Sequence, residues 1–271
     1  MRYRKGSIAL SRTQDYPLLH EVLQSGFITH NQLFELLRLD YCTTSRNAFN
    51  NRALRLVKHG LLTRSDVAFP SHDAVYSISQ RGALALAAQE SCFFESAGDF
   101  RAGRSNSSLQ HHLGLNAIRL ALKRTGCLVC WMSELEIRSR NDLTSCGYWK
   151  YYDAIVTVRV AGQDSKFALE YERTPKATRH YVAIRERLDQ ETTIPHFLYL
   201  VPSHNLMWFI AQRLSQCKRE VYIGLFRDFI EHTLMLQVRR NGSPTTSTLG
   251  SVLAKGREPQ HLGRLFADIA G

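Results

Sequence analysis

Three acidic residues lie on two stretches of the chain that alternate like β-strands and are joined by a short turn. Asp153 opens the first stretch, and Glu170 and Glu172 lie two residues apart near the end of the second. Because strand side chains alternate between faces, Glu170 and Glu172 are expected on one face. A hairpin that turns at Gly162 brings Asp153 close to Glu172. Crowded carboxylates repel one another unless a proton or a cation intervenes, and their hard oxygens suit Mg²⁺ or Mn²⁺.

Neighbouring charged residues extend this candidate metal site. A strand is predicted at residues 135–138, after or through Ser133 and Glu134, and Glu134 or Glu136 from this strand would complete the ligand set. Lys176, or Arg173 if it turns inward, would stabilise negative charge that develops on a phosphate. A metal ion held by these carboxylates would lower the pKa of a bound water and polarise the phosphate. The alternative is a set of surface carboxylates beside arginine and lysine.

The cysteine and histidine patterns favour packing over metal binding. Cys127 and Cys130 form a lone C-x-x-C pair inside an apolar run, whereas a zinc site would need a second pair. His111 and His112 lie in the first half of a predicted helix, where a histidine is more often a packing residue than a ligand. We therefore expect free thiols and hydrogen-bonded histidines at these positions.

Tyrosine chemistry is the alternative to metal-dependent chemistry at this site. Tyr148, Tyr151 and Tyr152 lie beside Asp153, but the chain has no His-x-His cluster to accompany a tyrosine nucleophile. A strand-packing ladder is the favoured interpretation of these tyrosines. The chain also has no G-x-x-x-x-G-K-[ST] or G-x-G-x-x-G motif, so no nucleotide cofactor is indicated.

A predicted helix from about Ser45 to His59 has one apolar face and one face of amide and basic side chains. Amide and guanidinium groups on an outer helix face offer hydrogen bonds to both base edges and phosphates. A solvated surface helix is the alternative. The candidate DNA-binding residues of this helix are Arg46, Asn47, Asn51, Arg52, Arg55 and Lys58.

The order of predicted elements around this helix is that of a winged helix-turn-helix. Two helices precede it, two short strands around a polar loop follow it, and a last helix spans Gln80 to Gln89. Arg64 lies on or near the wing and is a further candidate DNA-binding residue. We assign residues 1–95 to this domain, with protein–protein docking as the rival role.

The remainder of the chain reads as a second domain in an α+β, mixed fold. Residues 96–106 are small and polar and predict a linker. Residues 107–240 follow the order α-β-β-β-α-β, with a further helix and strands, which describes a mixed sheet with helices on both faces. Residues 241–271 are polar and predict a mobile tail apart from a short helix at His261–Ile269.

Composition narrows the class of partner. The chain has 271 residues, a net charge of +11 and a pI near 9.6, which points first to a nucleic acid and then to another anionic surface. Scattered cysteines and the lack of a signal peptide favour a reducing cytoplasm. No run approaches the roughly 18 apolar residues of a membrane-spanning helix.

The second domain resembles the PD-(D/E)xK nuclease superfamily. An aspartate on the middle strand, Asp153, and an acid on the next, Glu170, match its metal-binding positions. The match departs from the pattern in two places, since Tyr152 stands where proline is usual and Glu172 where a lysine is usual. Lys176, in the following helix, is the candidate replacement for that lysine.

Together, the winged helix and the degenerate nuclease domain resemble the plasmid replication-relaxation family, which includes MobC-type mobilisation relaxases. The resemblance implies a restriction-endonuclease-like second domain that nicks one strand at a transfer origin with Mg²⁺ or Mn²⁺. It also implies double-stranded DNA and other relaxosome proteins as partners. Because Glu172 departs from the pattern, a DNA-binding regulator with an inactive nuclease-like domain is the alternative. The recognised DNA sequence, the strand cut and the oligomeric state do not follow from the sequence.

Overall fold

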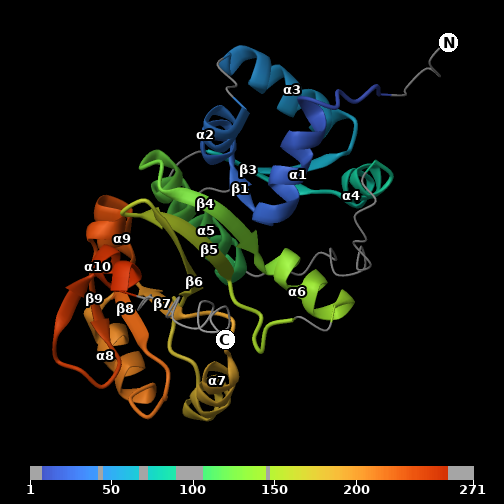
Figure 1. The fold of residues 1–271 in the computed structure, drawn as a ribbon. Helices are drawn as coiled ribbons and strands as arrows, with labels where there is room; N and C mark the ends of the chain where they lie inside the picture. The colour runs from blue at the N-terminus through green and yellow to red at the C-terminus, as the bar shows by residue number, and fades with distance from the viewer. Residues whose placement is uncertain (1–7, 42–44, 67–72, 90–105, 145–146, 256–271) are drawn as a thin grey trace, which may run out of the picture. The chain divides into compact units, whose positions relative to one another are not determined.

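The computed structural model describes residues 8–41, 45–66, 73–89, 106–144 and 147–255, and the chain divides into two compact units (Figure 1). The first unit comprises residues 1–126 and 132–153, and the second comprises residues 127–131 and 154–271. This grouping differs from the expected division, which assigned residues 107–240 to the second domain. The predicted linker at 96–106 lies outside the described residues, except for Asn106.

The first unit begins with the predicted three helices, two strands and a helix. A very short additional strand, β1, pairs with β3, so that the described strands form an antiparallel sheet in the order β1-β3-β2. The elements are α1 (Asp15–Ser25), β1 (Ile28–Thr29), α2 (His30–Tyr41), α3 (Arg46–Lys58), β2 (Leu62–Asp66), β3 (Ala74–Ile78) and α4 (Gln80–Ala87).

The core of the first unit explains why these elements form. Leu18, Leu33, Phe49 and Leu56 are fully buried in one apolar cluster that the helices share. Their helical spacing produces the apolar stripes seen in the sequence. Burial of a side chain of this size stabilises the fold by roughly 1.5–3 kcal/mol.

The helix α5 (Asn106–Arg124) packs in the first unit because buried polar contacts hold it to the N-terminal helices. The Arg119 guanidinium donates to both carboxylate oxygens of Glu21, in a pair that is almost entirely buried. The Asn116 amide donates to the Phe27 carbonyl at 2.7 Å. Local sequence patterns do not predict such contacts between residues about 90 positions apart.

The stretch after β4 (Leu128–Ser133) is a helix and not the predicted strand. The helix α6 (Glu134–Leu143) begins with a capping box, in which the Glu136 backbone N–H donates to the Ser133 hydroxyl and the Ser133 N–H donates to the Glu136 carboxylate. These two bonds satisfy N–H groups that a helix start leaves unpaired. The strand prediction for residues 135–138 is therefore wrong, and Glu134 and Glu136 stand on a first helical turn.

The second unit is built on a mixed sheet that has seven strands in the described part of the chain, in the order β10-β9-β8-β7-β6-β5-β4. The central strands β6, β7 and β8 are parallel, while β5 pairs antiparallel with β6, β9 with β8 and β10 with β9. In β4, only Leu128–Trp131 belongs to this unit. The remaining bounds are β5 (Ala154–Val160), β6 (Gln163–Tyr171), β7 (His196–Val201), β8 (Val221–Leu225), β9 (Gln237–Arg240) and β10 (Thr246–Thr248).

Helices flank this sheet. They are α7 (Thr178–Gln190), α8 (His204–Arg213), α9 (Phe226–His232), a 3₁₀ turn (Thr233–Met235) and α10 (Leu249–Lys255). The 3₁₀ turn directly precedes Leu236 and the strand β9. No helix of the described ranges is both long and apolar enough to cross a membrane.

The first part of the predicted mobile tail is folded. Asn241 is buried, and its side-chain amide donates to the carbonyl of Leu214 at 2.9 Å while its carbonyl accepts from Val221 N–H. Leu249, Val252 and Leu253 of α10 are also buried. The prediction of a mobile segment is therefore wrong for residues 241–255, whereas the helix suggested at 261–269 lies outside the described residues.

Candidate nucleic-acid interface and carboxylate site

The helix α3 presents its amide groups to solvent, as its sequence pattern predicts. The Ser45 side chain caps the helix by accepting from the Ala48 N–H at 3.2 Å. Phe49 and its apolar neighbours turn into the core, which leaves Asn47, Asn51 and Lys58 exposed on the other side. These three residues combine base-edge and phosphate donors on one helix surface.

Three arginines of α3 have partners within the first unit. The Arg55 guanidinium donates to both oxygens of Asp15 at 2.6 Å, and Arg52 Nε lies 3.5 Å from the same carboxylate. Arg46 donates to the Asn31 side chain. Asp15 is fully buried. Its contacts with Arg55 and Arg52, which are themselves partly exposed, therefore hold α3 against α1. Arg64 lies exposed on β2.

The two glutamates of the candidate metal site are buried at the carboxyl end of β6. Glu170 is paired in register with Tyr199 of the parallel strand β7, and the Glu172 N–H continues the ladder by donating to the Leu200 carbonyl at 3.0 Å. Their residue exposures are only 5% and 7%. Burial of charge is costly unless a counter-charge is present. Two carboxyl groups buried at this end of β6 therefore call for a compensating positive group.

Lys176 lies against one of these glutamates. Its ammonium group donates to the Glu172 carboxylate, and its backbone N–H donates to the Tyr181 hydroxyl at 3.3 Å. Burial is the main reason that the pKa of Tyr181 is raised above its ordinary value. Helix α7 begins at Thr178, so Lys176 precedes the helix rather than lying one turn inside it.

Asp153 has a histidine partner, His111, for which the sequence pattern favoured a packing role. His111 Nε2 lies 3.2 Å from Asp153 Oδ1, within the first unit. Asp153 comes directly before β5, whose first residue, Ala154, pairs with Leu169 of β6. His111 lies 42 residues away from Asp153 along the chain, and only the fold reveals the pairing.

Glu134 and the tyrosines that precede Asp153 in the sequence occupy unexpected settings. Glu134 forms an ion pair with Arg138 one helical turn along α6, at 2.8 Å, instead of standing on a strand. Tyr148, Tyr151 and Tyr152 lie in the segment between α6 and β5. The strand-packing interpretation of these tyrosines is therefore wrong.

The fit of a divalent cation to these residues is partial. Carboxylate oxygens of Glu170 and Glu172 are suitable ligands in type. The described residues hold no group of three or more His, Cys, Asp and Glu side chains arranged to bind a metal ion. The structure pairs Glu172 with Lys176 and Asp153 with His111. Within the described residues, Cys127, Cys130 and Cys217 are not joined in disulfide bonds.

Fold and site together define a two-unit α/β protein with an exposed amide-bearing helix and a buried carboxylate pair. The chain belongs to the replication-relaxation family, whose model matches residues 19–190. No curated protein is significantly similar to the chain. A solved structure titled as the restriction endonuclease FokI bound to DNA aligns with 80% of this chain and 43% of that one, at 9% identity and a TM-score of 0.26.

Proposed function

We propose that the protein binds double-stranded DNA at a specific sequence and nicks it, with Mg²⁺ or Mn²⁺, at the transfer origin of a plasmid or mobile element. Membership of the replication-relaxation family supports a role in plasmid replication or mobilisation. In this proposal residues 1–95 form a winged helix-turn-helix that chooses the site, and residues 107–240 form a PD-(D/E)xK-like nuclease domain.

The exposed face of α3 is the observation that carries the DNA-binding part. Asn47 and Asn51 are exposed asparagines on a helix whose opposite face is buried in the core. A side-chain amide can make two hydrogen bonds to the major-groove edge of adenine. Lys58 and Arg64 add positive charge that would contact phosphates. The ion pairs of Asp15 with Arg52 and Arg55 fix the helix that presents these groups.

The DNA-binding part is tested by measuring affinity for the cognate duplex and for a scrambled duplex. Asn51→Ala should lose roughly 1–3 kcal/mol of preference for the cognate site. Lys58→Ala should instead weaken both duplexes and lower the salt dependence by about 0.9 in the log–log slope. Asn205→Ala, at an exposed asparagine of α8, is the matched control. Equal effects of Asn51→Ala and Asn205→Ala would contradict the proposal.

The cleavage part rests on the buried carboxylates. A divalent metal ion would supply an activated water and a polarised phosphate when bound. Glu170 and Glu172 place two largely buried carboxyl groups at one strand end. Lys176 can stabilise charge on a phosphate only when it leaves Glu172, because its ammonium group is now engaged by that carboxylate.

The alternative proposal is a DNA-binding regulator whose nuclease-like domain is inactive. The Lys176–Glu172 ion pair favours it, since both groups already neutralise each other. Mobilisation of a plasmid between cells separates the two proposals. If the protein nicks DNA, Asp153→Ala and Glu170→Ala abolish transfer while leaving operator binding intact. A regulator tolerates both substitutions and loses function with Asn51→Ala.

A further inference from the structure

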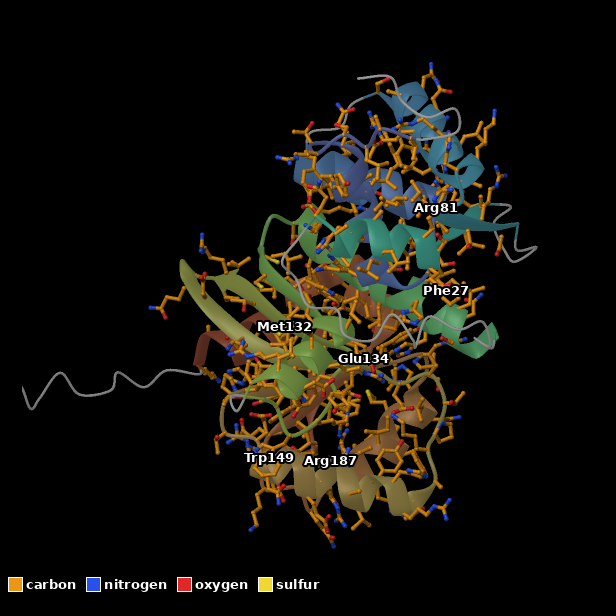
Figure 2. All side chains as sticks on the ribbon, turned by 90° about the vertical axis from the view of Figure 1, so that its right-hand side faces the viewer. Phe27, Arg81, Met132, Glu134, Trp149 and Arg187 are labelled. Carbon is orange, nitrogen blue, oxygen red and sulfur yellow. The ribbon has the colours of Figure 1, made fainter. Side chains whose placement is uncertain are left out.

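The segment between α6 and β5 displays aromatic side chains in an ordered pattern. Tyr148 and Tyr152 are buried, at 9% and 0% exposure, whereas Trp149 and Tyr151 between them are 57% and 47% exposed. Figure 2 labels Trp149 in this segment and Glu134 at the start of the preceding helix α6. We call residues 147–153 the aromatic segment. Two buried rings anchor it, and two rings are left at the surface.

The aromatic segment is fixed to α6 through one asparagine. The Asn141 side chain donates to the Tyr148 carbonyl at 3.0 Å and accepts from the Tyr148 N–H at 2.6 Å. A side chain at Gly147 would collide with Asn141, because an added Cβ would lie 2.7 Å from its Oδ1 atom. The exposed rings are therefore presented by a held backbone, which reduces the entropy lost when a ligand binds them.

Positive groups accompany the aromatic rings. The Arg138 guanidinium lies 5.3 Å from the centroid of the Tyr151 ring, and the Arg140 guanidinium lies 5.5 Å from that of Tyr148. Lys150 Nζ lies 5.1 Å from the centroid of the Tyr152 ring. Glu134 offsets part of this charge through its ion pair with Arg138. Cations therefore lie over the exposed ring of Tyr151 and over the two buried rings that anchor the segment.

We propose that the aromatic segment and the exposed face of α6 bind an unpaired nucleic-acid strand. Bases would stack on Trp149 and Tyr151, and phosphates would contact Arg138, Arg140 and Lys150. Base–aromatic stacking tolerates any sequence, because every base has a π-face. A duplex cannot use the surface in this way, since its bases are already stacked on one another.

This inference goes beyond duplex recognition by α3 and depends on neither α3 nor the carboxylates of β6. It does complement the proposed nicking, because a nick followed by local melting produces an unpaired strand. The two ideas fail separately. Loss of duplex binding or nicking would leave binding to a single-stranded oligonucleotide untouched.

The test is fluorescence anisotropy of the full chain with a labelled oligothymidylate of about 20 nucleotides, long enough for several stacked bases. Trp149→Ala and Tyr151→Ala should each weaken binding roughly tenfold, and Trp149→Phe should retain most of the affinity. Trp208→Ala is the matched control. Trp208 is 52% exposed on α8, with the Arg239 guanidinium 3.8 Å from its ring centroid, in the second unit.

The proposal is supported if Trp149→Ala weakens oligothymidylate binding, Trp149→Phe restores it and Trp208→Ala leaves it unchanged. Equal losses for Trp149→Ala and Trp208→Ala would overturn it, as would no loss for either. A parallel titration uses vesicles of phosphatidylserine and phosphatidylcholine. If Trp149→Ala weakens binding to vesicles but not to the oligonucleotide, the surface recognises a membrane and the nucleic-acid proposal is wrong.

Discussion

The ion pairs of the first unit differ in how far their side chains are exposed to solvent. Glu21 and Arg119 are 4% and 8% exposed, whereas the Arg124 side chain, paired with Glu35, is 52% exposed. Removing one partner of a buried pair leaves an uncompensated charge, but an exposed pair is solvated in either state. Two ion pairs that link α5 to the N-terminal helices should thus have unequal effects on stability.

Arg119→Gln should lower the free energy of unfolding by roughly 3–5 kcal/mol, because it strands the buried Glu21 carboxylate. Arg124→Gln is the matched control and should cost less than about 1 kcal/mol. Urea unfolding monitored by circular dichroism measures both. Similar losses for the two variants would show that the burial difference has no energetic consequence.

His196 makes the stability of the second unit depend on pH. Burial at the start of β7 lowers its pKa below the ordinary value of 6.5, and the nearby Glu220 carboxylate opposes this only in part. The unfolded chain therefore binds a proton more readily than the folded chain just below pH 6.5. Stability from this residue is complete above that pH and falls as the pH drops toward the folded-state pKa.

His196→Phe should reduce the loss of thermal stability between pH 7.5 and pH 5.5, because the substitution removes the group that must stay neutral in the fold. Differential scanning fluorimetry at both pH values measures the change in Tm. Equal losses of Tm in wild type and variant over this interval would contradict the proposed effect of His196 on stability.

At the scale of elements, α3 depends on α1 for its position. Asp15 accepts hydrogen bonds from Arg55 and from the Ser11 N–H at 2.7 Å, and its carboxylate forms an ion pair with Arg52 at 3.5 Å. It therefore connects three parts of the first unit through one buried carboxylate. Any DNA contact made by α3 should depend on this residue although Asp15 itself is inaccessible to DNA.

Asp15→Asn should destabilise the first unit by roughly 3 kcal/mol, since both arginines lose a buried counter-charge. It should also weaken duplex binding at temperatures where the chain remains folded, because α3 is less well fixed. Thermal unfolding and DNA affinity measured on the same sample check both effects. A destabilised variant with unchanged DNA affinity would show that α3 does not need this anchor.

Local patterns predicted most helices and strands because their signals are local. Ser45 before α3 and the apolar spacing of Phe49, Ala53 and Leu56 suffice to place that helix. The same reasoning failed at α6, although Ser133 and Glu136 form a capping-box sequence. The alternating apolar residues at 135 and 137 looked like a strand, and the capping signal should have taken precedence.

The candidate site was only partly predictable, for a physical reason. Strand alternation in the sequence predicts that Glu170 and Glu172 lie on one face. The contacts of His111 with Asp153 and of α5 with the N-terminal helices join residues far apart in sequence. No periodicity or composition encodes such pairings, because they arise only when separate elements pack together.

For the whole molecule, we propose that one chain both binds a DNA site and cuts it. Its net charge of +11 favours binding to nucleic acid without deciding whether cleavage follows. The two proposed functions are assigned to different elements, α3 and β6, so substitutions can test them separately. Glu170→Gln keeps the size of the side chain while removing its charge.

The most direct test is relaxation of a supercoiled plasmid that carries its own transfer origin. Wild type should convert it to the open-circular form only when Mg²⁺ or Mn²⁺ is present. Glu170→Gln should slow that conversion by about 100-fold or more while binding the origin duplex as tightly as wild type. Wild-type protein that binds the origin but never relaxes the plasmid, or a Glu170→Gln variant that relaxes it normally, would contradict the account.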